Sequence, residues 1–137
     1  MKVMGAGDID KNECNTVKGA NGVLRGDLNG DGTEDFAMLF GTKESHRKEN
    51  GDLYRYMLVV FVSGKDKKYQ TKVLTDYEDF FPPIIFINIH TPGNIEELGT
   101  GKTAIVKHPA IDLTYCGKSA VTYFWKDQKF SEIWTSD

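Results

Sequence analysis

A chain of 137 residues is long enough for one domain with its own hydrophobic core. Its 17 basic and 20 acidic residues are well mixed and give a net charge of −3, so no basic block or stripe indicates a nucleic-acid partner. The longest apolar runs are far too short to cross a bilayer, which argues against a membrane span.

The first 21 residues are rich in Gly, Asn and Lys and contain few apolar side chains. They predict a loosely packed N-terminal arm (1–21), followed by a single domain over 22–137. The opening stretch lacks the apolar core of a signal peptide. Cys14 and Cys116 lie in no CxxC pattern, which excludes zinc and thioredoxin-like sites. Two alternatives remain for them: one disulfide closing a long loop in an exported protein, or two unpaired and partly buried thiols.

From residue 22 onward, short apolar and β-branched segments alternate with turn residues, as in an all-β domain. A run of consecutive apolar residues, Tyr56–Val62, predicts a central strand covered on both faces. The segments 75–81 and 94–99 each predict a turn or two of helix. We therefore expect an all-β, antiparallel domain of two packed blade-like sheets with little helix. Roughly nine strands are predicted, at 22–26, 35–41, 53–64, 69–75, 84–89, 102–108, 110–115, 119–125 and 129–136.

The stretch GDLNGDGTEDFAMLF (26–40) places acidic or amide side chains at alternate positions around two glycines. Crowded carboxylates repel one another unless a cation lies among them, and Ca²⁺ takes six to eight oxygen ligands. Gly32 permits the sharp turn that such a loop needs. An EF-hand is rejected, because Met38 stands where its bidentate Glu is required and no flanking helix is predicted. The alternative is a metal-free hairpin loop built from Asn-Gly and Asp-Gly turns.

The pattern D-x-N-x-D-G-x-x-D followed by FAMLFG resembles the calcium loop of FG-GAP and VCBS-type repeats, known from integrin propeller blades and many secreted bacterial proteins. The resemblance covers about residues 22–41. It implies a Ca²⁺ site formed by the side chains of Asp27, Asn29, Asp31 and Asp35 and the main-chain carbonyl of Thr33. A closed propeller needs several such repeats, and one loop excludes it unless chains assemble.

The C-terminal segments GKSAVTYFW and KFSEIWTSD resemble the end of small exported bacterial proteins, many of them uncharacterised, that carry one such loop. This resemblance implies a periplasmic or secreted protein and brings no catalytic residues with it. His46, His90 and His108 have no metal-ligand spacing, although His90 and His108 each close an apolar strand and would meet if those strands were neighbours. No serine or cysteine lies in a nucleophile motif.

The most apolar window, 79–89, contains Phe80 and Phe81, which would form a partner-binding patch if its strand lies at a sheet edge. The alternative is ordinary core followed by a Pro-Pro strand start. Together these features predict a calcium-stabilised, exported, non-enzymatic domain that binds a protein partner, with an inhibitor or immunity protein as one form. Two other functions stay open: a calcium-dependent hydrolase, and a structural or adhesive module. The sequence leaves the partner and the oligomeric state undetermined.

Overall fold

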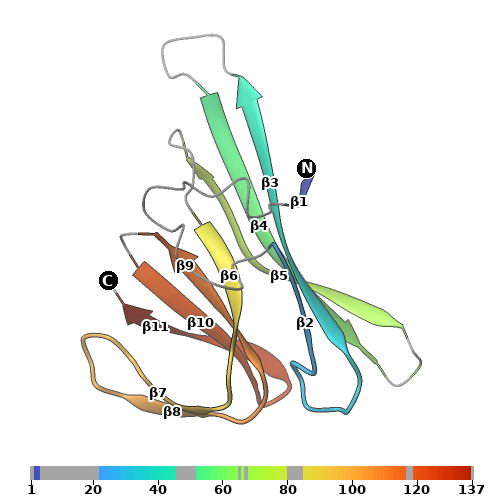
Figure 1. The fold of residues 1–137 in the computed structure, drawn as a ribbon, viewed down its shortest axis with the longest axis vertical. Coiled ribbons are helices and arrows are strands. Elements are labelled where there is room, and N and C mark those ends of the chain that lie inside the picture. Colours follow the sequence, from blue (N-terminus) through green and yellow to red (C-terminus); the bar gives the residue numbers. More distant parts are fainter. Residues whose placement is uncertain are drawn as a thin grey trace.

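The computed structural model describes residues 2–3, 22–45, 52–64, 66, 68–79, 85–116 and 119–136. These residues form strands joined by turns and contain no helix, and every strand pairing is antiparallel (Figure 1). The prediction of an all-β antiparallel fold is therefore confirmed. A five-stranded sheet contains β1 (Lys2–Val3), β2 (Val23–Gly26), β3 (Asp35–Ser45), β4 (Asp52–Ser63) and β5 (Tyr69–Asp79). A four-stranded sheet contains β6 (Ile85–His90), β9 (Ala110–Tyr115), β10 (Ser119–Lys126) and β11 (Lys129–Ser136).

The two larger sheets pack face to face around one core. Alternate residues of each strand point into it, because side chains of a strand alternate between the two faces of its sheet. The five-stranded sheet contributes Leu39, Leu58 and Val60, and the four-stranded sheet contributes Ile87 and Leu113, all fully buried. The strand β4 lies between β3 and β5, so the predicted central strand is central in the structure.

A third, smaller sheet was not expected. The strands β7 (Gly93–Glu96) and β8 (Thr103–Val106) pair with each other and form a two-stranded ribbon. The ribbon covers the outer face of the four-stranded sheet, where Ile95 and Val106 pack against Phe124 and Ile133 in a second apolar cluster. The four-stranded sheet is thus covered on both faces over part of its area.

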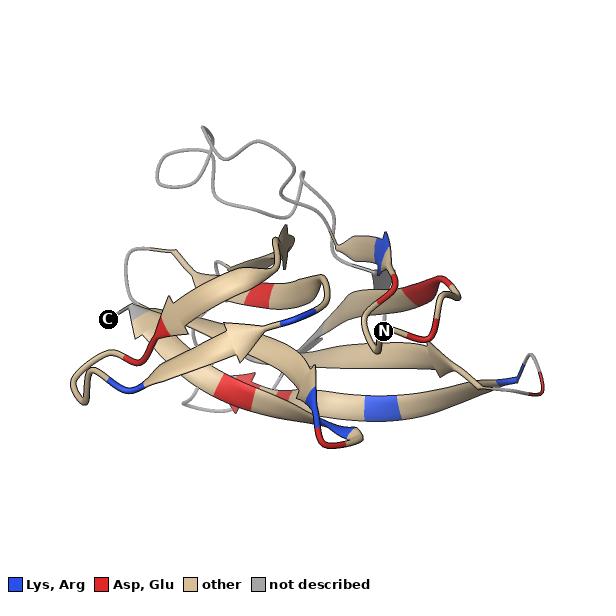
Figure 2. Ribbon diagram, turned by 90° about the horizontal axis from the view of Figure 1, so that it is seen from below, with Lys and Arg blue, Asp and Glu red and all other residues tan. Residues whose placement is uncertain are grey.

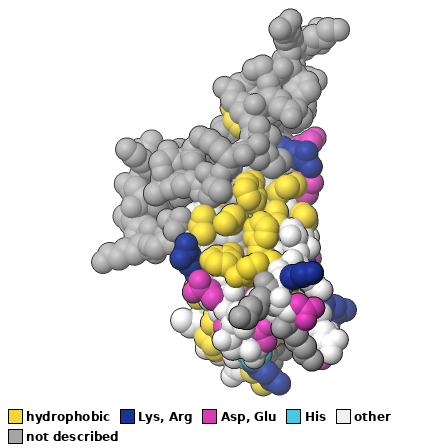
Figure 3. Space-filling model, turned by 90° about the vertical axis from the view of Figure 1, so that its right-hand side faces the viewer, with side chains coloured by type: hydrophobic (Ala, Val, Ile, Leu, Met, Phe, Trp, Pro, Cys, Tyr) yellow, Lys and Arg dark blue, Asp and Glu magenta, His cyan; other side chains and the backbone are white. Residues whose placement is uncertain are grey.

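The outer face of the five-stranded sheet is also apolar. Phe36, Met38 and Phe40 of β3 lie on it and are half-buried, and across from them lie the Val59 and Phe61 side chains of β4. Hydrophobic side chains gather on the side of the molecule seen in Figure 3. Charged residues, by contrast, lie mostly at turns and strand ends (Figure 2).

Both short helices expected from the sequence are wrong. Residues 75–79 continue β5, because they pair with Tyr54–Leu58 of the long neighbouring strand. Residues 94–96 belong to β7, whose single buried side chain, Ile95, holds it against the four-stranded sheet. Of the predicted N-terminal arm, Lys2–Val3 pairs with β3 as β1, and the other residues of the arm lie outside the described residues.

Candidate metal centre

The acidic loop connects β2 to β3, two antiparallel strands whose pairing closes at Gly26 and Asp35. Its one large apolar side chain, Leu28, is fully buried and belongs to the main core. Burial of Leu28 turns the alternating polar side chains of the loop to the opposite side. The loop is therefore anchored to the core at its second residue and open to solvent at its tip.

The structure brings three of the predicted ligands together. Asp27, Asp31 and Asp35 each offer one carboxylate oxygen, and these oxygens lie within 4.8 Å of one another. Exposure decreases along the set, from exposed Asp31 through half-buried Asp27 to fully buried Asp35. Three negative charges at this separation repel one another in the absence of a cation, so the cluster has the donor set of a site for a hard divalent metal ion.

Backbone amides of the loop donate hydrogen bonds to all three of these carboxylates, and those to Asp27 and Asp31 come from the tip of the loop. Gly32 N donates to Asp27 Oδ2 at 2.8 Å, and Asp31 N donates to Asp27 Oδ1 at 3.1 Å. Thr33 N donates to Asp31 Oδ1 at 2.9 Å and is the largest influence that lowers the pKa of Asp31 from its ordinary value. The loop thus curls around its carboxylates, and its amides stabilise the ionised form of Asp31.

The other two predicted ligands lie in the same curl. Asn29 Oδ1 accepts a hydrogen bond from Asp31 N at 3.3 Å, and Asn29 Nδ2 lies 3.4 Å from Asp31 Oδ2. Thr33 takes part through its amide. A ligand role for the Asn29 side chain and for the Thr33 carbonyl stays a prediction.

Asp35 has a second, purely structural task. Its Oδ2 accepts hydrogen bonds from Leu28 N at 2.8 Å and Asn29 N at 3.3 Å. Its Oδ1 accepts from the amide and the hydroxyl of Ser63, at 2.8 and 2.9 Å. Because Ser63 ends β4, this buried carboxylate joins the acidic loop to the end of the neighbouring strand. No signal in the sequence indicated Ser63, which is 28 residues away.

The tip of the loop depends on glycine and touches the other sheet. Gly30 and Gly32 have φ values of 76° and 84°, a left-handed conformation that glycine adopts without strain. A β-carbon built on Gly30 would lie 2.2 Å from Cε1 of His108, whereas one on Gly32 would meet nothing within 4 Å. His108 lies between β8 and β9, so the loop rests on the segment that leads into the four-stranded sheet.

The described histidines do not form a joint site. His90 Nδ1 lies 2.9 Å from Asp112 Oδ2, and Thr122 Oγ1 donates to the other oxygen of that carboxylate. His108 lies against Gly30 instead. In the His90–Asp112–Thr122 chain the carboxylate stands between the hydroxyl and the imidazole, so the histidine cannot take the proton of the hydroxyl as a general base must.

Two further predictions, the aromatic patch and the state of the cysteines, involve residues outside the described part of the chain. Phe80, Phe81 and His46 lie outside the described residues, so the proposed aromatic patch stays a prediction. Cys116 is buried and disulfide-bonded, and the only other cysteine of the sequence, Cys14, lies outside the described residues. The alternative of an unpaired Cys116 thiol is therefore wrong.

Comparisons of the chain with protein-family models, with curated proteins and with solved structures found no match. The resemblance to FG-GAP and VCBS-type repeats thus rests on the loop residues alone. The described part of the chain contains no helix with the length and apolar character needed to cross a membrane.

Proposed function

We propose that this protein is a calcium-stabilised, exported binding domain that recognises a macromolecular partner without catalysis, in the manner of an inhibitor or an immunity protein. The observation that carries the proposal is the group of carboxylate oxygens from Asp27, Asp31 and Asp35, within 4.8 Å of one another. Calcium accepts an irregular set of oxygen ligands more readily than Mg²⁺, which demands near-ideal octahedral geometry. An irregular loop with carboxylate, amide and carbonyl oxygens therefore favours calcium.

The position of the loop supports a stabilising role for the ion. The loop connects β2 to β3, and Asp35 also joins it to the end of β4. An ion held by the loop would fix these strands relative to one another, and its binding free energy would add to the free energy of unfolding. The disulfide at Cys116 supports export, because such bonds persist mainly in oxidising compartments.

The hydrolase alternative finds one supporting contact, the half-buried His90–Asp112 pair. Thr122 donates to Asp112 and not to His90, so among the described residues the pair has no nucleophile as a partner. The contact agrees better with a polar network that fixes strands β6, β9 and β10. A broad hydrolase screen of wild type and His90→Ala checks this, and turnover that disappears in the variant would favour the enzyme.

The test of the proposal uses protein stripped with EDTA and then titrated with calcium, followed by calorimetry and thermal unfolding. An ion bound only by the folded state stabilises it by about 2.7 kcal/mol at 100 times its Kd. Asp31→Ala should remove most of this stabilisation. Glu34→Ala is the matched control, because Glu34 is an exposed acid of the same loop that lies outside the carboxylate cluster. Equal calcium responses of the two variants would contradict the proposal.

A further inference from the structure

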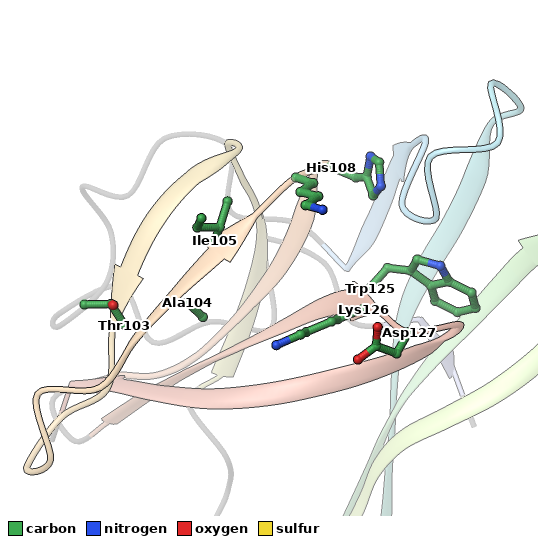
Figure 4. Close-up of a pocket in the computed structure, with 8 residues that line it drawn as sticks. Thr103, Ala104, Ile105, His108, Trp125, Lys126 and Asp127 are labelled. Atoms are coloured by element: carbon green, nitrogen blue, oxygen red, sulfur yellow. The ribbon is translucent and has the colours of Figure 1, made fainter.

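A groove of about 550 Å³ runs beside the β7–β8 ribbon (Figure 4). One wall consists of β8 itself, through Thr103, Ala104 and Ile105, and continues to Lys107 and His108. The opposite wall consists of the end of β10 and its turn, through Trp125, Lys126 and Asp127. The groove therefore lies along the flank of a strand and does not belong to the metal centre.

Within the part of the chain that the structure describes, one side of the strand that forms this wall is unpaired. Among the described residues β8 pairs with β7 alone, in a sheet of two strands. In an antiparallel pair every second residue directs its amide and carbonyl away from its partner. These groups of β8 can therefore receive an added strand, as other exposed sheet edges do when they bind extended peptides.

The β7–β8 ribbon is anchored to the four-stranded sheet, so β8 has a fixed position on which another strand can pair. Ile95 of β7 and Val106 of β8 are buried against Phe124 and Ile133. The other face of β8 is open, and Ile105 has 67% of its surface exposed. An added strand beside β8 would lie next to this solvent-exposed apolar side chain.

The charge around the groove selects the kind of strand. Lys107 and Lys126 are both exposed and lie on opposite walls, whereas Asp127 is the one acidic side chain among the described residues of the lining. The lining therefore carries more positive than negative charge, although the whole chain has a net charge of −3. Complementary charge steers a partner to its site and fixes its register.

From these observations we infer that an extended acidic segment of a protein partner binds in this groove as a third strand on β8. The inference rests on the proposed binding role and names the surface and the chemistry of that role. Main-chain hydrogen bonds to β8 would give affinity, and acidic side chains between Lys107 and Lys126 would give selectivity. The end of the groove at His108 touches Gly30, so the acidic loop supports one end of the binding surface.

The experiment titrates isotope-labelled, calcium-loaded protein with a short synthetic peptide of alternating glutamate and threonine. The same peptide with lysine in place of glutamate is the charge control. We expect the acidic peptide to slow amide hydrogen exchange within Thr103–Val106, because an added strand protects the outward amides of β8. The variant Lys107→Glu/Lys126→Glu should weaken binding by about tenfold or more, since like charges then face the peptide.

Lys68→Glu is the control variant, because it makes the charge change of each single groove substitution at an exposed residue beside the β4–β5 turn, outside the groove. It should leave the Kd unchanged. Equal binding of both peptides, protection at strands other than β8, or binding of a heparin oligosaccharide in place of the acidic peptide would each overturn the inference. Thermal scans of the same samples separate the two proposals: a calcium shift without peptide binding overturns this inference alone, whereas a missing calcium shift overturns the stabilising role of the ion.

Discussion

The imidazole of His108 fills the space that a side chain at Gly30 would need, with its Cε1 only 2.2 Å from the position of a β-carbon. Gly30→Ala should therefore lower the free energy of unfolding by about 3 kcal/mol, because it combines a left-handed alanine with an overpacked contact. Gly32→Ala should cost only about 1 kcal/mol, because its φ is equally unfavourable for alanine but its surroundings are open. Urea unfolding of both variants measures the difference.

A double-mutant cycle assigns that difference to the contact. In a His108→Ala background the space beside Gly30 is free, so Gly30→Ala should cost no more than Gly32→Ala. An equally large effect of Gly30→Ala with and without the histidine would show that the contact is unimportant for stability.

Asp35→Asn should destabilise the protein by about 3 kcal/mol even in EDTA. The buried carboxylate accepts four hydrogen bonds, two on each oxygen, and an amide would turn an NH₂ group toward two of the donors. Ser63→Ala, which removes a single hydroxyl donor, should cost about 1 kcal/mol. Chemical denaturation without calcium checks both values. An Asp35→Asn variant as stable as the wild type would refute the structural task of the carboxylate.

Alkaline pH should destabilise the protein through two buried tyrosines. Burial raises the pKa of Tyr56 and of Tyr123, with the Tyr115 hydroxyl and the Glu132 charge as the next causes, respectively. The unfolded chain then releases these protons near pH 10 while the folded chain keeps them, so the free energy of unfolding falls as the pH rises above 10.

Tyr56→Phe and Tyr123→Phe should each make this fall less steep, as measured by urea unfolding from pH 8 to about pH 11. Tyr69→Phe is the control, because Tyr69 is half-exposed and its ring lies against Phe36, away from the two buried tyrosines. Ultraviolet titration should show Tyr56 and Tyr123 ionising only when the protein unfolds. Parallel curves for wild type and all three variants would rule out these tyrosines as the cause.

Gln128→Gly should stabilise the protein by roughly 0.5–1 kcal/mol. The β10–β11 hairpin closes at Lys126 and Lys129 with two residues between them, and Asp127 and Gln128 have φ values of 53° and 65°. Such turns favour glycine at the second central position, and aspartate tolerates the left-handed conformation better than glutamine does. Thermal unfolding checks the gain, and Gln128→Ala, which keeps a β-carbon, should bring none.

The strands that were predicted correctly are those whose own residues show an alternating or continuous apolar pattern. Alternation and apolar runs indicated nine of the strands, including the central β4, because their own side chains fill the main core or the second apolar cluster. The loop aspartates were predicted for the same reason, since their spacing along the chain decides which side chains point inward together.

What the sequence did not show depends on contacts between distant residues. The strand β7 has one buried side chain, so its own residues show no strand alternation and were predicted as a helical turn. Contacts with Phe124 and Ile133 hold it as a strand. The end of β5 is a strand because β4 is long enough to pair with it. The support of Asp35 by Ser63, the contact of His108 with Gly30 and the groove beside β8 arise only once the sheets are assembled.

The order of the strands also sets an order of events during folding. In the larger sheets β3–β4–β5 and β9–β10–β11 are neighbours both in sequence and in space, whereas β6 must pair with β9 across the inserted β7–β8 ribbon. Short loops close with less loss of chain entropy than long ones, so the two sets of consecutive hairpins should form before β6 joins its sheet. Mutations at β6 such as Ile87→Val should then speed unfolding and leave the rate of refolding almost unchanged.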